Sequence, residues 1–92
     1  MRDINALREE IDQIDKAILT LFEARMLVIK EVAAYKSNLN KPLRDVKREQ
    51  ELIQNKIQLL EHEEHAVYVE KLFKEIMTSS LDYQKQLLKS KK

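Results

Sequence analysis

Residues 4–35 decide the fold, and they read INALREEIDQIDKAILTLFEARMLVIKEVAAY. One series of side chains in this stretch is spaced alternately three and four residues apart, and all but one of its members are apolar or aromatic. Such spacing is typical of the a and d positions of a helix that packs lengthwise against other helices. We therefore predict one continuous helix over about residues 3–36. The series, here called the seam, consists of Ile4, Leu7, Ile11, Ile14, Ile18, Leu21, Arg25, Val28, Val32 and Tyr35.

The length of this first helix bears on how the chain assembles. At ~1.5 Å per residue the helix would be about 50 Å long, which exceeds the diameter of a small globule. The chain has 92 residues, which fits a single domain spanning residues 1–92. The rest of so short a chain cannot cover the whole seam, because its own core is marginal. We therefore predict that the helix packs along a second copy of the chain in a homodimer.

Two shorter helices are predicted after a break at residues 37–44. Pro42 stops any helix that arrives from upstream, and Asp45 has the side chain of a helix N-cap. Helical spacing of apolar residues predicts a second helix over about residues 46–60 and a third over about residues 65–88. The predicted fold class is all-α, with three helices per chain.

The composition excludes several classes of protein. The chain has no Gly, no Cys and one Pro, which argues against tight hairpins, glycine-rich nucleotide loops, disulfide frameworks and cysteine nucleophiles. A formal net charge of +1 does not favour nucleic-acid binding. No apolar run suggests a membrane partner and no signal peptide is recognisable, so the expected location is the cytoplasm. Lys89, Lys91 and Lys92 are expected to form a solvated end.

Polar side chains interrupt the predicted buried faces of all three helices. Arg25 stands in the seam, and Lys36 lies three turns further along nearly the same face. Glu49 aligns with the apolar face of the second helix, while Ser80 and Gln84 continue that of the third. Each residue alone has an ordinary explanation, such as a register-fixing polar position, a small packing residue or a solvated end. Because an unpaired buried charge is strongly destabilising, one polar pocket shared by three helices explains the interruptions more economically.

The charges around this pocket indicate its ligand. Arg25, Lys36 and Arg48 are cations, whereas Glu49 is the one clear anion. An excess of fixed cations favours a small polyanion, and the fork of an arginine suits a carboxylate. Arg8 lies ~26 Å before Arg25 along the helix, too far to reach the same pocket. It would reach the pocket of a partner in an antiparallel dimer, or else remain exposed and pair along its own helix; the sequence favours neither.

Conventional catalytic groups are missing from the sequence. No nucleophile stands beside a recognisable base, and His62 and His65 are more typical of a solvated helix end than of a metal site. We therefore expect no metal and no cofactor. An enzyme with these residues would work by positioning its substrate and by fixed charges, without a covalent step.

Four groups of residues together span nearly the whole chain: LREEIDQID at residues 7–15, Arg25 with Lys36, PLRDVKRE at residues 42–49, and Ser80 with Gln84. These groups resemble the motifs of the all-helical chorismate mutases. The joint spacing of these groups is specific, although each is weak alone. The resemblance implies an intertwined homodimer of six helices that converts chorismate to prephenate without a cofactor. The reaction is a step of the shikimate pathway in aromatic amino-acid biosynthesis.

The resemblance also implies a role for each polar residue of the pocket. Some would hold the two substrate carboxylates, some would donate to the ether oxygen, and some would hold the ring hydroxyl. The carboxylate ligands are Arg25 and, from the partner, Arg8, supported by Arg48 and Ser80; the ether donors are Lys36 and Gln84; the hydroxyl partners are Asp45, through its backbone, and Glu49.

Three alternatives stay open from the sequence. Two are enzymes on the same scaffold, an isochorismate pyruvate lyase and an aminodeoxychorismate mutase. The pair Asp45 and Glu49 favours a ring that bears a hydroxyl, without excluding an amino group. The third is a helical dimerisation module with no active site, which the seam supports and the polar interruptions oppose.

Overall fold

The computed structural model describes residues 1–89, and over that range it contains helices and no strands. The elements in chain order are α1 (Ile4–Asn38), α2 (Val46–Gln58), the short 3₁₀ helix η1 (Glu63–His65) and α3 (Ala66–Lys89). The prediction of an all-α fold with one very long first helix is confirmed. Of the predicted solvated end, Lys91 and Lys92 lie outside the described residues.

α1 runs to Asn38, two residues beyond the predicted end, because a backbone motif caps its last turn. Asn40 adopts a left-handed conformation with φ 55°, which asparagine tolerates better than most residues. The Lys41 N–H donates to the Lys36 carbonyl at 2.9 Å, and the Asn40 N–H donates to the Ser37 carbonyl at 3.2 Å. These two bonds form a Schellman motif, which satisfies carbonyls that the helix end would otherwise leave free.

α2 begins at the predicted N-cap, where the Asp45 carboxylate accepts from the Arg48 N–H at 3.0 Å. It ends at Gln58, two residues before the predicted position. The N–H groups of Leu59 and Leu60 each bond a carbonyl three residues back, at 3.1 Å, which tightens the last turn. The polar stretch that follows forms η1, so α3 begins and ends one residue later than predicted.

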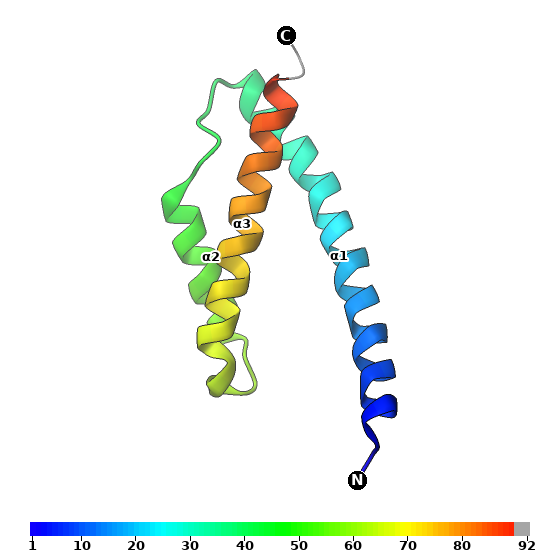
Figure 1. The fold of residues 1–92 in the computed structure, drawn as a ribbon. Helices are drawn as coiled ribbons and strands as arrows, with labels where there is room; N and C mark the ends of the chain where they lie inside the picture. The colour runs from blue at the N-terminus through cyan, green and yellow to red at the C-terminus, as the bar shows by residue number, and fades with distance from the viewer. Residues whose placement is uncertain (90–92) are drawn as a thin grey trace.

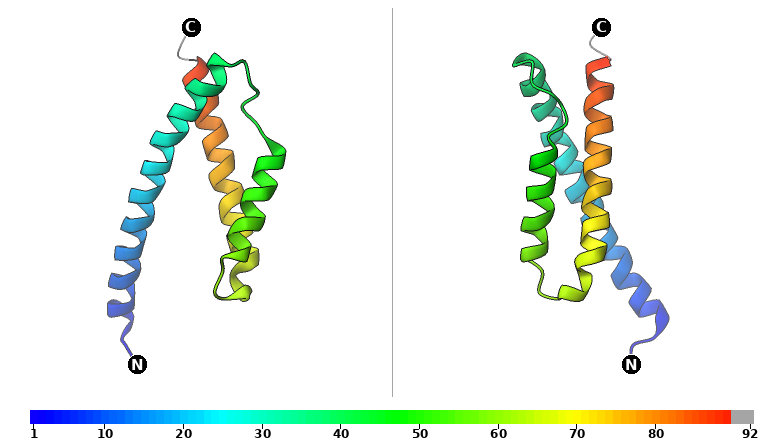
Figure 2. Two further views of the ribbon diagram at one scale, coloured as in Figure 1. Left: turned by 180° about the vertical axis from the view of Figure 1, so that it is seen from behind. Right: turned by 90° about the vertical axis from the view of Figure 1, so that its left-hand side faces the viewer.

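The three long helices form a fork (Figure 1). α3 packs against α2 and against the C-terminal half of α1, whereas the N-terminal half of α1 diverges and stands apart in every view (Figure 2). The fold measures 56 × 27 × 14 Å and has a radius of gyration of 16.7 Å. A compact domain of this length would have a radius of gyration of about 12 Å. The single chain is therefore extended for its size.

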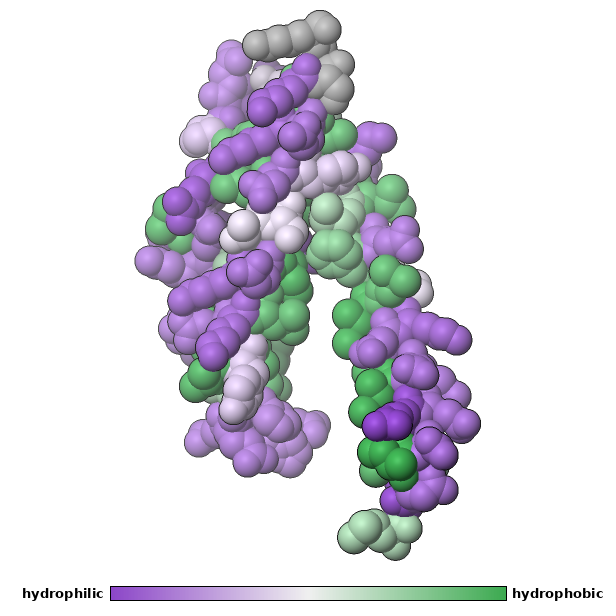
Figure 3. Space-filling model, in the orientation of Figure 1, coloured by the Kyte–Doolittle hydropathy of each residue, from purple (hydrophilic) through white to green (hydrophobic). Residues whose placement is uncertain are grey.

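The isolated chain has almost no hydrophobic core. Within residues 1–89 the buried apolar side chains are Ala33, which is 2% exposed, and Ile53, which is 9% exposed. Figure 3 shows hydrophobic side chains along the side of the free arm that faces α3, with hydrophilic ones along its outer side. The seam of this arm therefore has no cover from its own chain. Its members that are more than half exposed are Ile4, Ile11, Ile14, Ile18 and Leu21.

The accessible surface leads to the same conclusion. The chain exposes 7908 Å², whereas a compact monomer of its mass would expose about 5,600 Å². The excess of about 2,300 Å² is consistent with the near absence of a core. None of the helices within residues 1–89 combines the length and the apolar character needed to cross a membrane.

Candidate active site

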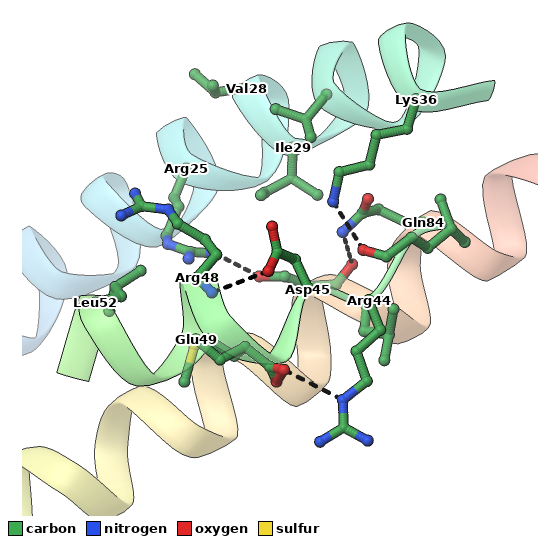
Figure 4. A pocket seen from close by; sticks show the side chains of 15 residues that line it. Arg25, Val28, Ile29, Lys36, Arg44, Asp45, Arg48, Glu49, Leu52 and Gln84 are labelled. Atoms are coloured by element: carbon green, nitrogen blue, oxygen red, sulfur yellow. Dashed lines mark hydrogen bonds and ion pairs between the residues drawn. The ribbon is translucent and has the colours of Figure 1, made fainter. Parts of the chain in front are cut away.

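A pocket of about 350 Å³ lies where α1, α2 and α3 meet. Polar side chains enter it from the C-terminal half of α1, from the segment at the start of α2 and from α3 (Figure 4). Apolar side chains from the same three helices complete the wall. The lining consists of Arg25, Val28, Ile29, Val32, Lys36, Leu43, Arg44, Asp45, Arg48, Glu49, Leu52, Met77, Ser80, Leu81 and Gln84.

Arg25 is held in the pocket by a hydroxyl and by no carboxylate. Its guanidinium donates to Ser80 Oγ, and Ser80 in turn donates to the Ile76 carbonyl at 2.7 Å. Burial, and then the neighbouring charge of Arg48, lower the pKa of Arg25. Within residues 1–89, no acidic side chain forms an ion pair with Arg25 or Arg48. Two like charges thus share a partly buried space, and a bound anion would relieve their repulsion.

Lys36 supplies a third cation from the end of α1. Its Nζ donates to the Leu43 carbonyl at 2.7 Å, which ties the last turn of α1 to the segment that precedes α2. An ammonium has three donors, so two remain for a ligand. Because no carboxylate of the described residues pairs with Lys36, its full charge faces the pocket (Figure 4).

Gln84 is the most deeply placed amide of the site, with 5% exposure. Its Nε2 donates to the Ser80 carbonyl one turn earlier at 3.2 Å, and its Oε1 is buried with no hydrogen-bond partner among the described residues. A buried, unpaired carbonyl is destabilising. The amide nitrogen also has a second hydrogen. Gln84 therefore has one acceptor and one donor left for a ligand, close to the ammonium of Lys36 (Figure 4).

Two carboxylates border the pocket, and they point in different directions. The Asp45 carboxylate caps α2 through the Arg48 N–H and lies toward the pocket interior (Figure 4). The Glu49 carboxylate turns toward the guanidinium of Arg44, whose Nε donates to Glu49 Oε2 at 3.2 Å. Both acids come from the first turn of α2 or its cap, where the helix dipole favours negative charge.

Seven of the eight predicted site residues line this one pocket: Arg25, Lys36, Asp45, Arg48, Glu49, Ser80 and Gln84. Arg8 does not, since it lies in the free arm of α1 and is exposed. Sequence reasoning missed Arg44, because this residue precedes α2 and interrupts no apolar stripe. It also missed the Leu43 carbonyl, because a backbone acceptor leaves no trace in the residue type.

The arrangement suits the binding and polarisation of a small polyanion. The pocket gathers three cations without acidic partners, a deep amide and an apolar wall, and nothing in it resembles a nucleophile with a base. In a partly dry site, fixed donors of this kind stabilise charge that develops on a bound oxygen. Within residues 1–89, no cluster of His, Asp and Glu side chains has the geometry to hold a metal ion.

Comparison with known proteins places the chain in a family. Residues 7–85 match the family described as chorismate mutase type II. The chain is 40% identical over 84 residues to the bifunctional chorismate mutase/prephenate dehydratase of Enterobacter agglomerans, an overlap of 90% of this chain and 22% of that protein. It is 36% identical over 84 residues to the protein of the same description from Escherichia coli K12, with the same coverage.

A more distant relative agrees with these two. The bifunctional chorismate mutase/prephenate dehydratase of Aquifex aeolicus is 29% identical over 91 residues, or 95% of this chain and 25% of that protein. No solved structure matches the chain. The chain thus spans about a quarter or less of the length of these curated relatives. Since the family match extends over most of the chain, this protein belongs to the chorismate mutase type II family.

Proposed function

We propose that this chain is a chorismate mutase that rearranges chorismate to prephenate in aromatic amino-acid biosynthesis. The observation that carries the proposal is the pocket in which Arg25, Lys36 and Arg48 converge without acidic partners. Chorismate has two carboxylates, an ether oxygen and a ring hydroxyl, and the pocket offers complementary groups for one carboxylate, the ether oxygen and the hydroxyl. The relatives named chorismate mutase/prephenate dehydratase support the same substrate.

The reaction is an isomerisation in which no atom is gained or lost. The ether C–O bond breaks while a C–C bond forms between the enolpyruvyl side chain and the ring, and negative charge develops on the ether oxygen. Donors aimed at that oxygen bind the transition state more tightly than the ground state. We assign this role to Lys36 Nζ and to the second hydrogen of Gln84 Nε2, which lie together in the pocket.

The remaining groups hold the substrate in its reactive conformation. Arg25 binds one carboxylate, with Ser80 fixing its guanidinium and Arg48 adding a second positive charge. Asp45 and Glu49 hold the ring hydroxyl from the start of α2. Clamping both ends of a flexible molecule removes much of the entropic barrier to the reaction.

The proposal includes a homodimer of six helices, in which Arg8 of the partner subunit binds the second carboxylate. The exposed seam of α1 supports it, because an apolar face of this length needs a cover. If each subunit buried its excess of about 2,300 Å², the interface would total about 4,600 Å², within the range of obligate dimers. The cytoplasmic location remains a prediction, which cell fractionation tests.

The direct test is to add the purified chain to chorismate and follow the loss of its ultraviolet absorbance, with product analysis. The expected product is prephenate. Parallel incubations with isochorismate and with aminodeoxychorismate separate the other two activities on this scaffold. Release of pyruvate from isochorismate, or rearrangement of aminodeoxychorismate alone, would assign the protein to one of those activities. No turnover of any of the three would leave the dimerisation module as the function.

A further inference from the structure

The ion pair between Arg44 and Glu49 separates two hollows of the surface. Both residues line the main pocket, and both also line a second hollow of about 310 Å³ on the other side of the pair, between α2 and α3. Lys74 and Thr78 of α3 border the second hollow and are absent from the first. The Arg44–Glu49 pair therefore forms part of the wall between the proposed active site and the second hollow.

Of the two carboxylates that border the pocket, Glu49 is the one whose charge is balanced by another side chain, that of Arg44. Arg44 Nε donates to its Oε2 at 3.2 Å, and the side chains are 64% and 28% exposed respectively. In contrast, one carboxylate oxygen of Asp45 accepts the hydrogen bond that caps α2. Arg44 engages Glu49 through Oε2, so Oε1 is left for a ligand.

We propose that Arg44 is a positioning residue that orients Glu49 and offsets its charge, so that the site prefers a neutral hydroxyl on the substrate ring over an ammonium. The proposal rests on the proposed function, because it concerns the ring substituent of that substrate. A carboxylate compensated by a guanidinium still accepts a hydrogen bond from a hydroxyl. Its attraction for a cation is weaker, because the guanidinium repels that cation.

The proposal predicts a shift in selectivity when the guanidinium is removed. The Arg44→Gln variant leaves the Glu49 carboxylate uncompensated, which should favour the ammonium of 4-amino-4-deoxychorismate over the hydroxyl of chorismate. The measured quantity is the inhibition constant of the amino compound divided by the KM for chorismate. Because Arg44 is largely solvent-exposed and Glu49 partly so, this ratio should fall by about three- to fivefold. KM for chorismate should rise with kcat nearly unchanged, as expected for a contact made equally in both states.

Lys74→Gln is the matched control. It removes one positive charge from the same hollow, but Lys74 pairs with Glu70 at 2.9 Å and does not line the main pocket. The selectivity ratio of Lys74→Gln should equal that of the parent. Arg44→Lys, which keeps the charge, should recover most of the parental ratio.

A double-mutant cycle decides whether Arg44 acts through Glu49. In a Glu49→Gln background, Arg44→Gln should lower the ratio by less than in the parent, since only the direct repulsion between the guanidinium and the ammonium is then removed. Equal ratios for Arg44→Gln and the parent, an equal fall in Lys74→Gln, or a fall of the same size in the Glu49→Gln background would each overturn the role of Arg44. A parent protein that does not rearrange chorismate would instead overturn the proposed function, so the two failures are distinguishable.

Discussion

The two halves of α1 share one spacing pattern and meet very different surroundings. In the C-terminal half, Ala33 is 2% exposed against α3, and the same half contributes Arg25 and Lys36 to the pocket. In the N-terminal half no side chain is buried, and Ile14 of the seam is 53% exposed. A heptad pattern predicts that a face will be buried, but does not state which chain will bury it.

The two halves of α1 also differ in the polarity of their seam residues. From Ile4 to Leu21 every seam residue is apolar, whereas the seam of the C-terminal half is interrupted by Arg25. An uninterrupted apolar seam suits helix packing, and an interrupted one suits a site. We therefore infer that the free half covers another subunit and contributes Arg8 to its site, while the packed half carries Arg25 and Lys36 of the site.

The largest expected effect comes from placing a charge in the free half. Ile14→Asp should abolish dimerisation and reduce activity to the background, because an interface would have to bury an unpaired carboxylate. Sedimentation and the chorismate assay measure the two effects. Leu19→Asp is the matched control, since Leu19 is exposed to a similar extent, 58%, but lies off the seam. If Ile14→Asp and Leu19→Asp dimerised equally well and were equally active, the seam would be no more important for dimerisation than the rest of the free arm.

The next largest effect comes from the packed half. Lys36→Ala should lower kcat by about 10²–10³-fold, the loss expected for one donor to a developing oxyanion. The variant should still dimerise, because Lys36 lies outside the free arm. Lys41→Ala is the control, as Lys41 is an exposed cation that contacts the Tyr35 ring at 5.8 Å. A Lys36→Ala enzyme with parental kcat would show that the ether oxygen lies elsewhere.

The third prediction concerns the other donor. In Gln84→Glu the new carboxylic acid can donate only while protonated, and its ionised form would repel the developing negative charge. The variant should therefore be poor at pH 8 and should gain activity as the pH falls, while the parent changes little. The measurement is kcat/KM against pH, with folding checked by circular dichroism. A flat profile at parental activity would separate Gln84 from the ether oxygen.

The smallest expected effect is a trade-off between the stability of the free protein and substrate binding beside Arg25 in the packed half of α1. Burial lowers the pKa of Arg25, and the neighbouring charge of Arg48 lowers it further, so the two guanidinium groups repel each other in the free protein. Arg48→Gln should therefore stabilise the free protein by about 0.5 kcal/mol, the size of an exposed charge interaction. It should also raise KM for chorismate by about tenfold, as a charged hydrogen bond to the substrate is lost. A higher melting temperature with an unchanged KM would show that Arg48 does not bind the substrate.

Much of the fold was predictable because its signals are local. The seam predicted α1, and Asp45 at the start of an apolar pattern predicted the beginning of α2 to the residue. The end of α1 was not predictable in the same way, because it depends on the left-handed backbone of Asn40 and on two backbone bonds. Asparagine permits that conformation without requiring it.

The candidate site was predictable where a residue contradicts its own helix face. Arg25, Ser80 and Gln84 interrupt the apolar stripes of their helices, so each could be identified from the sequence. All three line the pocket. Arg44 interrupts nothing, since it precedes α2 in an exposed segment, and its pairing with Glu49 emerges only from the folded geometry. A residue that works through a neighbour leaves no periodic signal in the sequence.

The most direct test of a site shared between the free half of one subunit and the packed half of another is a mixing experiment. Arg8→Ala and Arg25→Ala should each be nearly inactive, because each loses a carboxylate ligand from both sites of its homodimer. After subunit exchange at equal concentrations, the mixed dimers should each contain one intact site and restore about a quarter of the parental activity. No recovery, with exchange demonstrated by mass spectrometry of labelled chains, would contradict the shared site.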